Sequence, residues 1–208
     1  MVRIMFLWEK NLLRKKKFEF IAGLDEAGRG PLAGPLVVAA VILKPEQRKI
    51  YLSHKIADSK LLTPKQRAEA FKEIIKSAWI GIGIAEVGLI DNTNIFYATQ
   101  FAADSALINL RKKPDYVLTD AGIQISSNYP YTCIIKGESK SFSIACASIV
   151  AKVIRDRIME VYDFFFPHYA FKLHKGYGTQ LHFNLLKKHG PSPLHRQSFA
   201  PIRDWFKR

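Results

Sequence analysis

Residues 35–43 (PLVVAAVIL) form a continuous apolar run rich in β-branched side chains. Such a run predicts a strand buried on both faces, which requires a sheet covered by other elements on each side. The segment 18–24 (FEFIAGL) alternates and then becomes apolar, which predicts another strand. Between the two, residues 27–34 hold three glycines and a proline, which is typical of a tight connection. We therefore expect an opening hairpin whose turn carries the unusual residues.

Helical and strand patterns alternate along the rest of the chain. Thr63 is a candidate N-cap, and Pro64 suits the first position of a helix. Antiparallel opening strands followed by alternating helices and strands predict an α/β fold with a mixed sheet. The expected later elements are a helix from 64 with Ala68, Phe71, Ile74 and Ile75 on its apolar face, a strand over 79–87, a helix over 90–110 with Ile95, Ala98, Phe101, Ala102 and Ile108 inward, strands over 115–120 and 131–136, and helices over 142–162 and 179–189.

The composition is that of one globular domain of ordinary size. Of the 208 residues, 48% are hydrophobic and 24% charged, so the chain can bury a core without a disulfide or a structural metal. The most apolar stretch, 30–43, is interrupted by prolines and glycines and falls short of the ~18 residues of a membrane span, so no membrane partner is expected. Cys133 and Cys146 are too few for a disulfide scaffold. They fit a reducing compartment, and we expect a cytoplasmic protein.

The charge of the chain indicates a class of partner. Lys and Arg outnumber Asp and Glu by 32 to 18, which gives a formal net charge of +14. A strongly basic domain usually meets a polyanion, and nucleic acid is the first candidate. Colloidal solubility or adaptation to high temperature is the alternative explanation. Charge alone does not say what is done to the partner.

Three acidic residues follow predicted strands. Asp25 and Asp120 each end an apolar strand, and Glu138 lies just beyond a third one. Acids at strand ends can converge at one edge of a sheet, where ligands commonly bind. Oxygen-only ligands suit Mg²⁺ or Mn²⁺, and two such ions can act together in phosphodiester cleavage. For any one of these acids alone, a capping or turn role is the alternative.

The turn after the first strand contains Gly28, Arg29 and Gly30. Glycines let the backbone approach a ligand closely, and an arginine offers a fork of donors to phosphate. A plain glycine turn with a solvated arginine is the alternative. Its position directly after Asp25 and Glu26 favours a role at the same site.

The segment 21–43 (IAGLDEAGRGPLAGPLVVAAVIL) resembles the opening signature of bacterial and archaeal ribonuclease HII. Further stretches resemble the family in the same order, so that the resemblance covers nearly everything from Ile21 to Ile202. They are Asp58-Ser59-Lys60, Asn94-Ile95, Asp120, KGESKSFSIACASIVAKVIRDR from Lys136, HKGYGT from His174 and HGPSPLHRQSFAPI from His189.

The resemblance implies a ribonuclease H-like α/β fold, with a five-stranded mixed sheet flanked by helices. It implies one catalytic domain over 1–208, of which 165–208 would be a helical, substrate-binding C-terminal extension. The expected activity is metal-dependent cleavage of the RNA strand of RNA–DNA hybrids. Incision on the 5′ side of single ribonucleotides in duplex DNA is also expected, leaving 3′-hydroxyl and 5′-phosphate ends. We expect the protein to act as a monomer.

The resemblance also assigns roles to residues. Asp25, Glu26, Asp120 and Glu138 would be the catalytic carboxylates that bind two Mg²⁺ or Mn²⁺ ions. In a regular strand Glu26 points away from Asp25, so it would contribute through its backbone carbonyl or after a bulge. The substrate-binding residues would be Gly28, Arg29 and Gly30 at the ribose 2′-hydroxyl and flanking phosphates, Tyr177 against the deoxyribose on the 3′ side, and Lys60 and Asn94 at the strand backbone.

Glu138 departs from the pattern, because most relatives have Asp at this place. The related ribonuclease HIII group uses Glu, but it has Gly-Lys-Gly in place of Gly28-Arg29-Gly30. It also has an extra N-terminal domain, for which the 24 residues before Asp25 are too few. The longer side chain could shift the preference between Mg²⁺ and Mn²⁺.

Other residues receive structural interpretations. We expect His174, His182, His189 and His195 to contact phosphate or lie on helix surfaces, since they lack metal-ligand spacing. We interpret Asp156 as part of a structural ion pair, and the serines at 139, 141 and 143 as helix-start caps. Two further hypotheses are another nuclease on the same fold, such as a strand transferase or junction resolvase, and a non-catalytic binding module. Cleavage of all-DNA substrates would favour the former, and salt-dependent binding without a metal-dependent product the latter.

Overall fold

The sheet at the centre of the protein has five strands. The computed structural model describes residues 7–14, 18–47 and 62–205. The strands are β1 (Ile21–Ala27), β2 (Leu36–Leu43), β3 (Ala78–Ala85), β4 (Tyr116–Asp120) and β5 (Tyr131–Ile134), in the spatial order β3-β2-β1-β4-β5.

The expected hairpin and mixed sheet are both confirmed. β1 pairs antiparallel with β2, and β2 with β3, whereas β1 and β4, and β4 and β5, pair in parallel. Every residue of β2 is buried, as its continuous apolar run predicts. Asp25 and Asp120 end up on adjacent parallel strands, β1 and β4, near their carboxyl ends.

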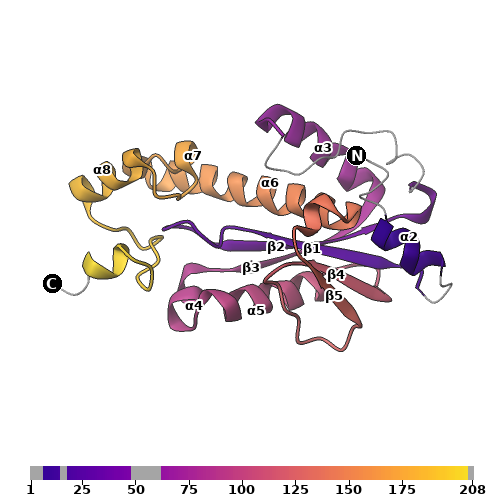
Figure 1. The fold of residues 1–208 in the computed structure, drawn as a ribbon. Helices are drawn as coiled ribbons and strands as arrows, with labels where there is room; N and C mark the ends of the chain where they lie inside the picture. The colour runs from indigo at the N-terminus through magenta and orange to yellow at the C-terminus, as the bar shows by residue number, and fades with distance from the viewer. Residues whose placement is uncertain (1–6, 15–17, 48–61, 206–208) are drawn as a thin grey trace.

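Helices cover both faces of the sheet (Figure 1). On one face lie α3 (Pro64–Ser77) and α6 (Phe142–Phe165), which share a core with the sheet through residues such as Ile74 and Phe142. On the other face lie α4 (Val87–Asn92) and α5 (Ile95–Ile108), packed through an alanine-rich surface. The helix α2 (Leu7–Arg14) lies near β4 and β5. The short elements η1 (Pro45–Gln47) and η3 (Gly137–Ser139) connect the larger ones.

The start of α3 agrees with its sequence signals, but its face does not agree fully. Thr63 caps the helix, Gln66 completes a reciprocal capping box, and Pro64 is its first residue. Phe71 and Ile74 are buried as expected. Ile75 is 48% exposed, so its assignment to the apolar face was wrong.

The expected helix over 90–110 is two helices. The helical conformation is interrupted at Thr93. Asn94 is the N-cap of α5, and its side chain accepts a hydrogen bond from the backbone N–H of Tyr97 at 2.9 Å. Phe101 and Ile108 are 46% and 81% exposed, so the prediction that they point inward was wrong. The helix instead packs mainly through Ala98, Ala102 and Ala106, and these small residues let α5 approach the glycines of β3 closely. An added Cβ on Gly81 or Gly83 would lie within about 2 Å of a backbone carbonyl of α5.

The C-terminal part is helical, as expected, with three short helical elements besides the one predicted over 179–189. It contains η4 (Pro167–Tyr169), α7 (Phe171–His174), α8 (Gln180–His189) and η5 (Ile202–Trp205). In Figure 1 these lie at the end of α6, beside the turn between β1 and β2. Within the described ranges, none of the helices is both long and apolar enough to span a membrane.

Candidate active site

Asp25 is a buried acid in the central strand. It lies opposite Ala39 of β2, and its Oδ1 accepts the backbone N–H of Glu26 at 2.8 Å. Burial raises the pKa of Asp25 well above its usual value, and the charges of Glu26 and Asp120 raise it further. A hydrogen bond with Ser148 of α6 acts in the other direction. An acid in this environment favours the ionised form only when a positive charge is near.

Asp120 lies at the end of β4, the strand that neighbours β1, and interacts electrostatically with Asp25. Its Oδ1 accepts the backbone N–H of Gly137 at 2.6 Å, which ties the strand to η3. Burial raises the pKa of Asp120, and the neighbouring charge of Glu138 contributes in the same direction. Glu138 itself is buried in η3, at the point where α6 is about to begin. Asp120 therefore interacts electrostatically with Asp25 and with Glu138, which leaves the predicted cluster of three carboxylates a prediction.

Glu26 occupies a different position. The register of β1 on β2 continues from Asp25 through Glu26 and Ala27, so the suggested bulge is absent from this strand. Oε1 of Glu26 lies 3.7 Å from Nη1 of Arg29. This contact joins the acidic residues to the Gly28-Arg29-Gly30 turn.

The four acids fit a divalent cation in their donor chemistry and charge. All offer carboxylate oxygens, the ligands that Mg²⁺ and Mn²⁺ prefer. Burial and the neighbouring acids raise the pKa of Asp25 and of Asp120, and a bound cation would favour the ionised form of both. Nowhere in the described ranges do three His, Cys, Asp or Glu side chains already converge closely enough to hold a metal.

Two buried arginines, not identified from the sequence, hold the glycine-rich turn. Arg155 of α6 is fully buried and donates three hydrogen bonds to backbone carbonyls. Its Nε reaches Pro35 at 2.9 Å, and its two terminal nitrogens reach Ala33 at 3.1 Å and Lys175 at 2.9 Å. One guanidinium thus joins the β1–β2 turn to the loop that carries Tyr177.

Arg196 does the same from the C-terminal segment. It is also fully buried and donates to the carbonyls of Gly28, Arg29 and Gly34 at 2.6–3.0 Å. Burial, and then the positive charge of Arg155, lower the pKa of Arg196 to about 9. The guanidinium therefore remains charged at neutral pH and fixes both arms of the turn.

Three glycines allow these arginines to approach the backbone. Gly28, Gly34 and Gly176 all have positive φ angles of 83–103°, which other residues rarely adopt. A Cβ on Gly28 would lie 2.2 Å from Nε of Arg155, and one on Gly176 would lie 2.3 Å from the carbonyl oxygen of Ala33. Larger residues would break the contact between the turn and the loop.

Tyr177 is 41% exposed and lies on this support. Its ring centroid is 5.7 Å from the guanidinium of Arg155 and 5.6 Å from Nζ of Lys152. Lys152 pairs with Asp156 at 2.7 Å, so the predicted structural ion pair of Asp156 is confirmed. Among the serines, Ser141 is the N-cap of α6, as expected.

Three histidines form a buried cluster behind Tyr177, so their expected surface positions were wrong. His174 and His182 stack at 4.1 Å, and Nε2 of His182 lies 3.0 Å from Nε2 of His195. His182 donates from Nδ1 to the carbonyl of Tyr177 at 2.9 Å, so its Nε2 accepts the Nε2–H of His195. Nδ1 of His195 accepts the backbone N–H of Ser192 at 2.8 Å. Each ring is thereby held in one neutral tautomer, and only His189 of the four is exposed.

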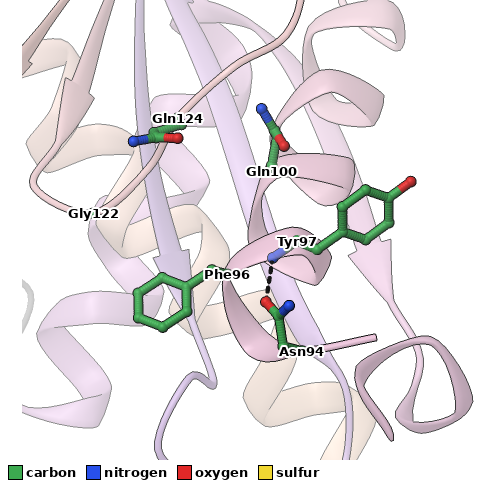
Figure 2. A pocket seen from close by; sticks show the side chains of 6 residues that line it. All are labelled: Asn94, Phe96, Tyr97, Gln100, Gly122 and Gln124. Atoms are coloured by element: carbon green, nitrogen blue, oxygen red, sulfur yellow. Dashed lines mark hydrogen bonds between the residues drawn. The ribbon is translucent and has the colours of Figure 1, made fainter. Parts of the chain in front are cut away.

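Asn94 lies at a pocket of about 460 Å³ beside the glycine-rich turn. Figure 2 shows Phe96 and Tyr97 pointing in different directions from the start of α5, with Gly122 and Gln124 on the facing loop. The guanidinium of Arg29 lies 5.1 Å from the ring centroid of Phe96. This contact connects the pocket to the acidic residues through Arg29. Lys60, the remaining predicted residue, lies outside the described residues.

The sequence matches the family model of ribonuclease HII over residues 22–202. Ribonuclease HII of Enterococcus faecalis is 49% identical over 191 residues, which are 91% of this chain and 73% of that protein. Ribonuclease HII of Thermotoga maritima is 49% identical over 191 residues, covering 91% and 77% of the two chains.

Solved structures share the fold. The ribonuclease H2 of Pyrococcus horikoshii superposes with a TM-score of 0.75 at 26% identity, covering 91% of this chain and 98% of that one. RNase HII of Archaeoglobus fulgidus, solved in complex with PCNA, gives 0.75 at 25% identity, covering 88% and 96%. Bst-RNase HIII in complex with Mn²⁺ gives 0.74 at 17% identity, covering 90% and 69%, which shows the fold alone.

These likenesses agree with the five-stranded mixed sheet and confirm the ribonuclease H-like fold. They also decide between the two groups considered, since the family model is that of ribonuclease HII. The chain belongs to the ribonuclease HII family, metal-dependent endoribonucleases that cleave the RNA strand of RNA–DNA hybrids and incise duplex DNA on the 5′ side of embedded ribonucleotides, leaving 3′-hydroxyl and 5′-phosphate ends.

Proposed function

We propose that Asp25, Glu26, Asp120 and Glu138 are the catalytic carboxylates of this endoribonuclease and bind two divalent cations, Mg²⁺ or Mn²⁺. The observation that carries the proposal is the burial of Asp25 beside Asp120, with the pKa of each raised by burial and by neighbouring acids. Acidic groups held together in a basic protein call for a cation between them. Bound cations of this kind supply positive charge to the attacking and leaving oxygens of phosphodiester hydrolysis.

The chain's own residues position these acids. Gly137 donates to Asp120, so that the oxygen on the strand and the turn carrying Glu138 keep a fixed separation. The backbone N–H of Glu26 donates to Asp25 and orients that carboxylate. Glu26 also contacts Arg29, so the cleavage site and the recognition turn keep a constant relation.

The substrate would be recognised beside the acids. The Gly28-Arg29-Gly30 turn would contact the ribose 2′-hydroxyl, the group that distinguishes RNA from DNA. Tyr177 would pack on the deoxyribose that follows on the 3′ side. Support comes from Arg155, which connects the turn to the loop of Tyr177, and from Arg196, which ties the turn to the C-terminal segment. Asn94 and Lys60 would contact the strand backbone, which positions the duplex without reading its sequence.

The remaining features of the proposal concern the whole chain. Residues 1–208 would form one catalytic domain, with 165–208 as a substrate-binding extension that supplies Tyr177 and Arg196. The protein would act as a monomer in the cytoplasm, where its two free cysteines stay reduced. Repair of misincorporated ribonucleotides and removal of primers are the processes that need such an incision.

The first test uses a DNA duplex with one ribonucleotide, incubated with Mg²⁺ or Mn²⁺ in turn. Asp25→Asn and Asp120→Asn should each abolish nicking on the 5′ side while leaving duplex binding largely intact. Glu73→Gln, on the far exposed surface of α3, is the matched control and should nick normally. Retained nicking in either Asp variant would refute the assignment of the carboxylates.

The second test addresses Tyr177. Tyr177→Ala should reduce incision at a single ribonucleotide more than cleavage of a long hybrid, because only the former depends on the deoxyribose after the junction. Tyr177→Phe keeps the ring and should retain the preference. Equal loss on both substrates in the Ala variant would contradict the junction role.

A further inference from the structure

Glu9 is a buried acid far from the others in sequence. Its Oε1 accepts three hydrogen bonds, from the hydroxyl of Ser141 at 2.6 Å, the hydroxyl of Ser143 at 2.8 Å and the backbone N–H of Ser143 at 3.0 Å. Burial raises the pKa of Glu9, and these hydrogen bonds oppose the rise. A buried carboxylate that gathers three donors has a specific structural task.

The donors belong to the first turn of α6. The free N–H groups and the dipole at the start of this 24-residue helix favour a negative group there. Ser141 caps the helix by accepting the N–H of Ile144, while its hydroxyl hydrogen goes to Glu9. Glu9 therefore completes the cap from a different segment of the chain.

Other residues of α2 pack against the same part of the protein, around the first turn of α6. Leu12 and Leu13 pack against a cluster of Ile21, Leu118, Ile134 and Ile144, which combines β1, β4, β5 and α6. In Figure 1 the helix lies beside the ends of β4 and β5. It precedes the part of the chain that the ribonuclease HII family model covers, 22–202.

The segment held by Glu9 leads directly to the proposed catalytic carboxylates. The backbone N–H of Ser141 donates to the carbonyl of Gly137 at 2.8 Å, and Gly137 donates to Asp120. Glu138 lies within this turn. On the other side, the backbone of Ser143 is so close to β1 that a Cβ on Gly23 would lie 2.2 Å from it. The first turn of α6 thus sets the distance from β1 to the turn of Glu138.

We propose that Glu9 is a positioning residue for the cation site, and that α2 fixes the Glu138 turn against β1 and β4 through Ser141 and Ser143. The proposal rests on the assignment of Glu138 as a metal-binding carboxylate. It makes the docking of α2 and the binding of a divalent cation mutually dependent, because coupling between two sites is reciprocal. Residues that orient metal ligands typically change metal affinity by 10- to 100-fold when removed.

The test measures Mn²⁺ binding to the full chain by calorimetry, without substrate. Glu9→Ala should raise the Kd for Mn²⁺ by about tenfold or more. Glu9→Gln should give a smaller rise, because a neutral acceptor makes weaker hydrogen bonds than a carboxylate. Asn11→Ala, at an exposed position of the same helix, should leave the Kd unchanged. If Glu9→Ala does not fold, as judged by circular dichroism, Glu9→Gln decides.

A second readout uses hydrogen exchange. Mn²⁺ should slow amide exchange in residues 7–14 of the wild type, and this protection should be lost in the Glu9 variants. A folded Glu9 variant with the wild-type Kd and the wild-type protection would overturn the inference. Asp25→Asn separates the two proposals: Mn²⁺ binding that survives this change refutes the carboxylate site itself. Binding lost in Asp25→Asn but unaltered in the Glu9 variants refutes only the role of Glu9.

Discussion

Lowering the pH from 7 to 5 should destabilise the protein through its buried histidines. Burial lowers the pKa of His182 and of His195 to about 4, and lowers that of His174 as well. In the folded chain each of these rings has only one nitrogen left to protonate, and that nitrogen already accepts a hydrogen bond. A second proton on His182 would face the N–H of His195, and one on His195 would face the N–H of Ser192. In the unfolded chain both imidazoles return to the ordinary value of 6.5.

The size of the effect follows from these values. Below pH 6.5 the imidazoles bind protons in the unfolded chain but not in the folded chain. Their contribution to the free energy of unfolding is therefore fully present above pH 6.5 and is lost as the pH falls toward 4. At pH 5 a single imidazole with these values lowers the free energy of unfolding by about 2 kcal/mol. This is a large part of the ~5–15 kcal/mol of a typical domain. The raised pKa values of Glu9, Asp25 and Asp120 act in the opposite direction.

Comparison of variants removes the contribution of the acids. Urea unfolding gives the free energy of unfolding at pH 7 and at pH 5. The decrease in this free energy between the two pH values should be about 2 kcal/mol smaller in His195→Asn than in the wild type. Asparagine can still accept the N–H of Ser192. His189→Asn, which changes an exposed ring, is the control and should lose as much stability as the wild type. An equal loss in His195→Asn and the wild type would refute this account.

Further changes test the packing around the site. Gly23→Ala should lower the free energy of unfolding by at least about 2 kcal/mol, measured in urea, because its Cβ would collide with the backbone of Ser143. Arg196→Lys should lower it by about 3 kcal/mol or more and should also lower the preference for single ribonucleotides, since an ammonium cannot replace four guanidinium hydrogen bonds. Phe96→Ala should leave the melting temperature within a few degrees but raise the KM for the duplex, because Arg29 loses its aromatic support.

Local sequence patterns predicted most of the sheet and its helices. The apolar run of β2 and the glycine-rich turn before it suffice for the hairpin, because burial on both faces and a tight connection leave few alternatives. Thr63 and Pro64 marked the start of α3 through capping chemistry that is local in the sequence. The exposed positions of Phe101 and Ile108 could not be predicted, since they depend on glycines of another element that draw α5 close to β3.

The candidate site divides in the same way. Asp25 and Asp120 could be chosen as candidates because acids at the ends of apolar strands are conspicuous in the sequence. The family resemblance then assigned them a metal-binding role. Arg155 and His182 could not be identified, because a single sequence gives no sign that an arginine or a histidine is buried. Their burial results from backbone carbonyls that lie 20 or more residues away for Arg155, and from the stacking of rings brought together by folding for His182. Glu9 was missed for the same reason, since its partners are over 130 residues distant.

The two interior guanidiniums also bear on how the enzyme responds to ionic strength. Each donates its hydrogen bonds to neutral carbonyls, and within the described part of the chain neither forms a salt bridge, although Asp156 and Asp91 act on them from a greater distance. The electric field of a surface lysine passes through solvent, and at physiological ionic strength mobile ions screen that field over about 8 Å. Charges enclosed by protein are screened much less. Arg155 and Arg196 therefore provide a constant positive potential beneath the glycine-rich turn, and attraction for a phosphate at that point should persist in salt that removes the contribution of the outer surface.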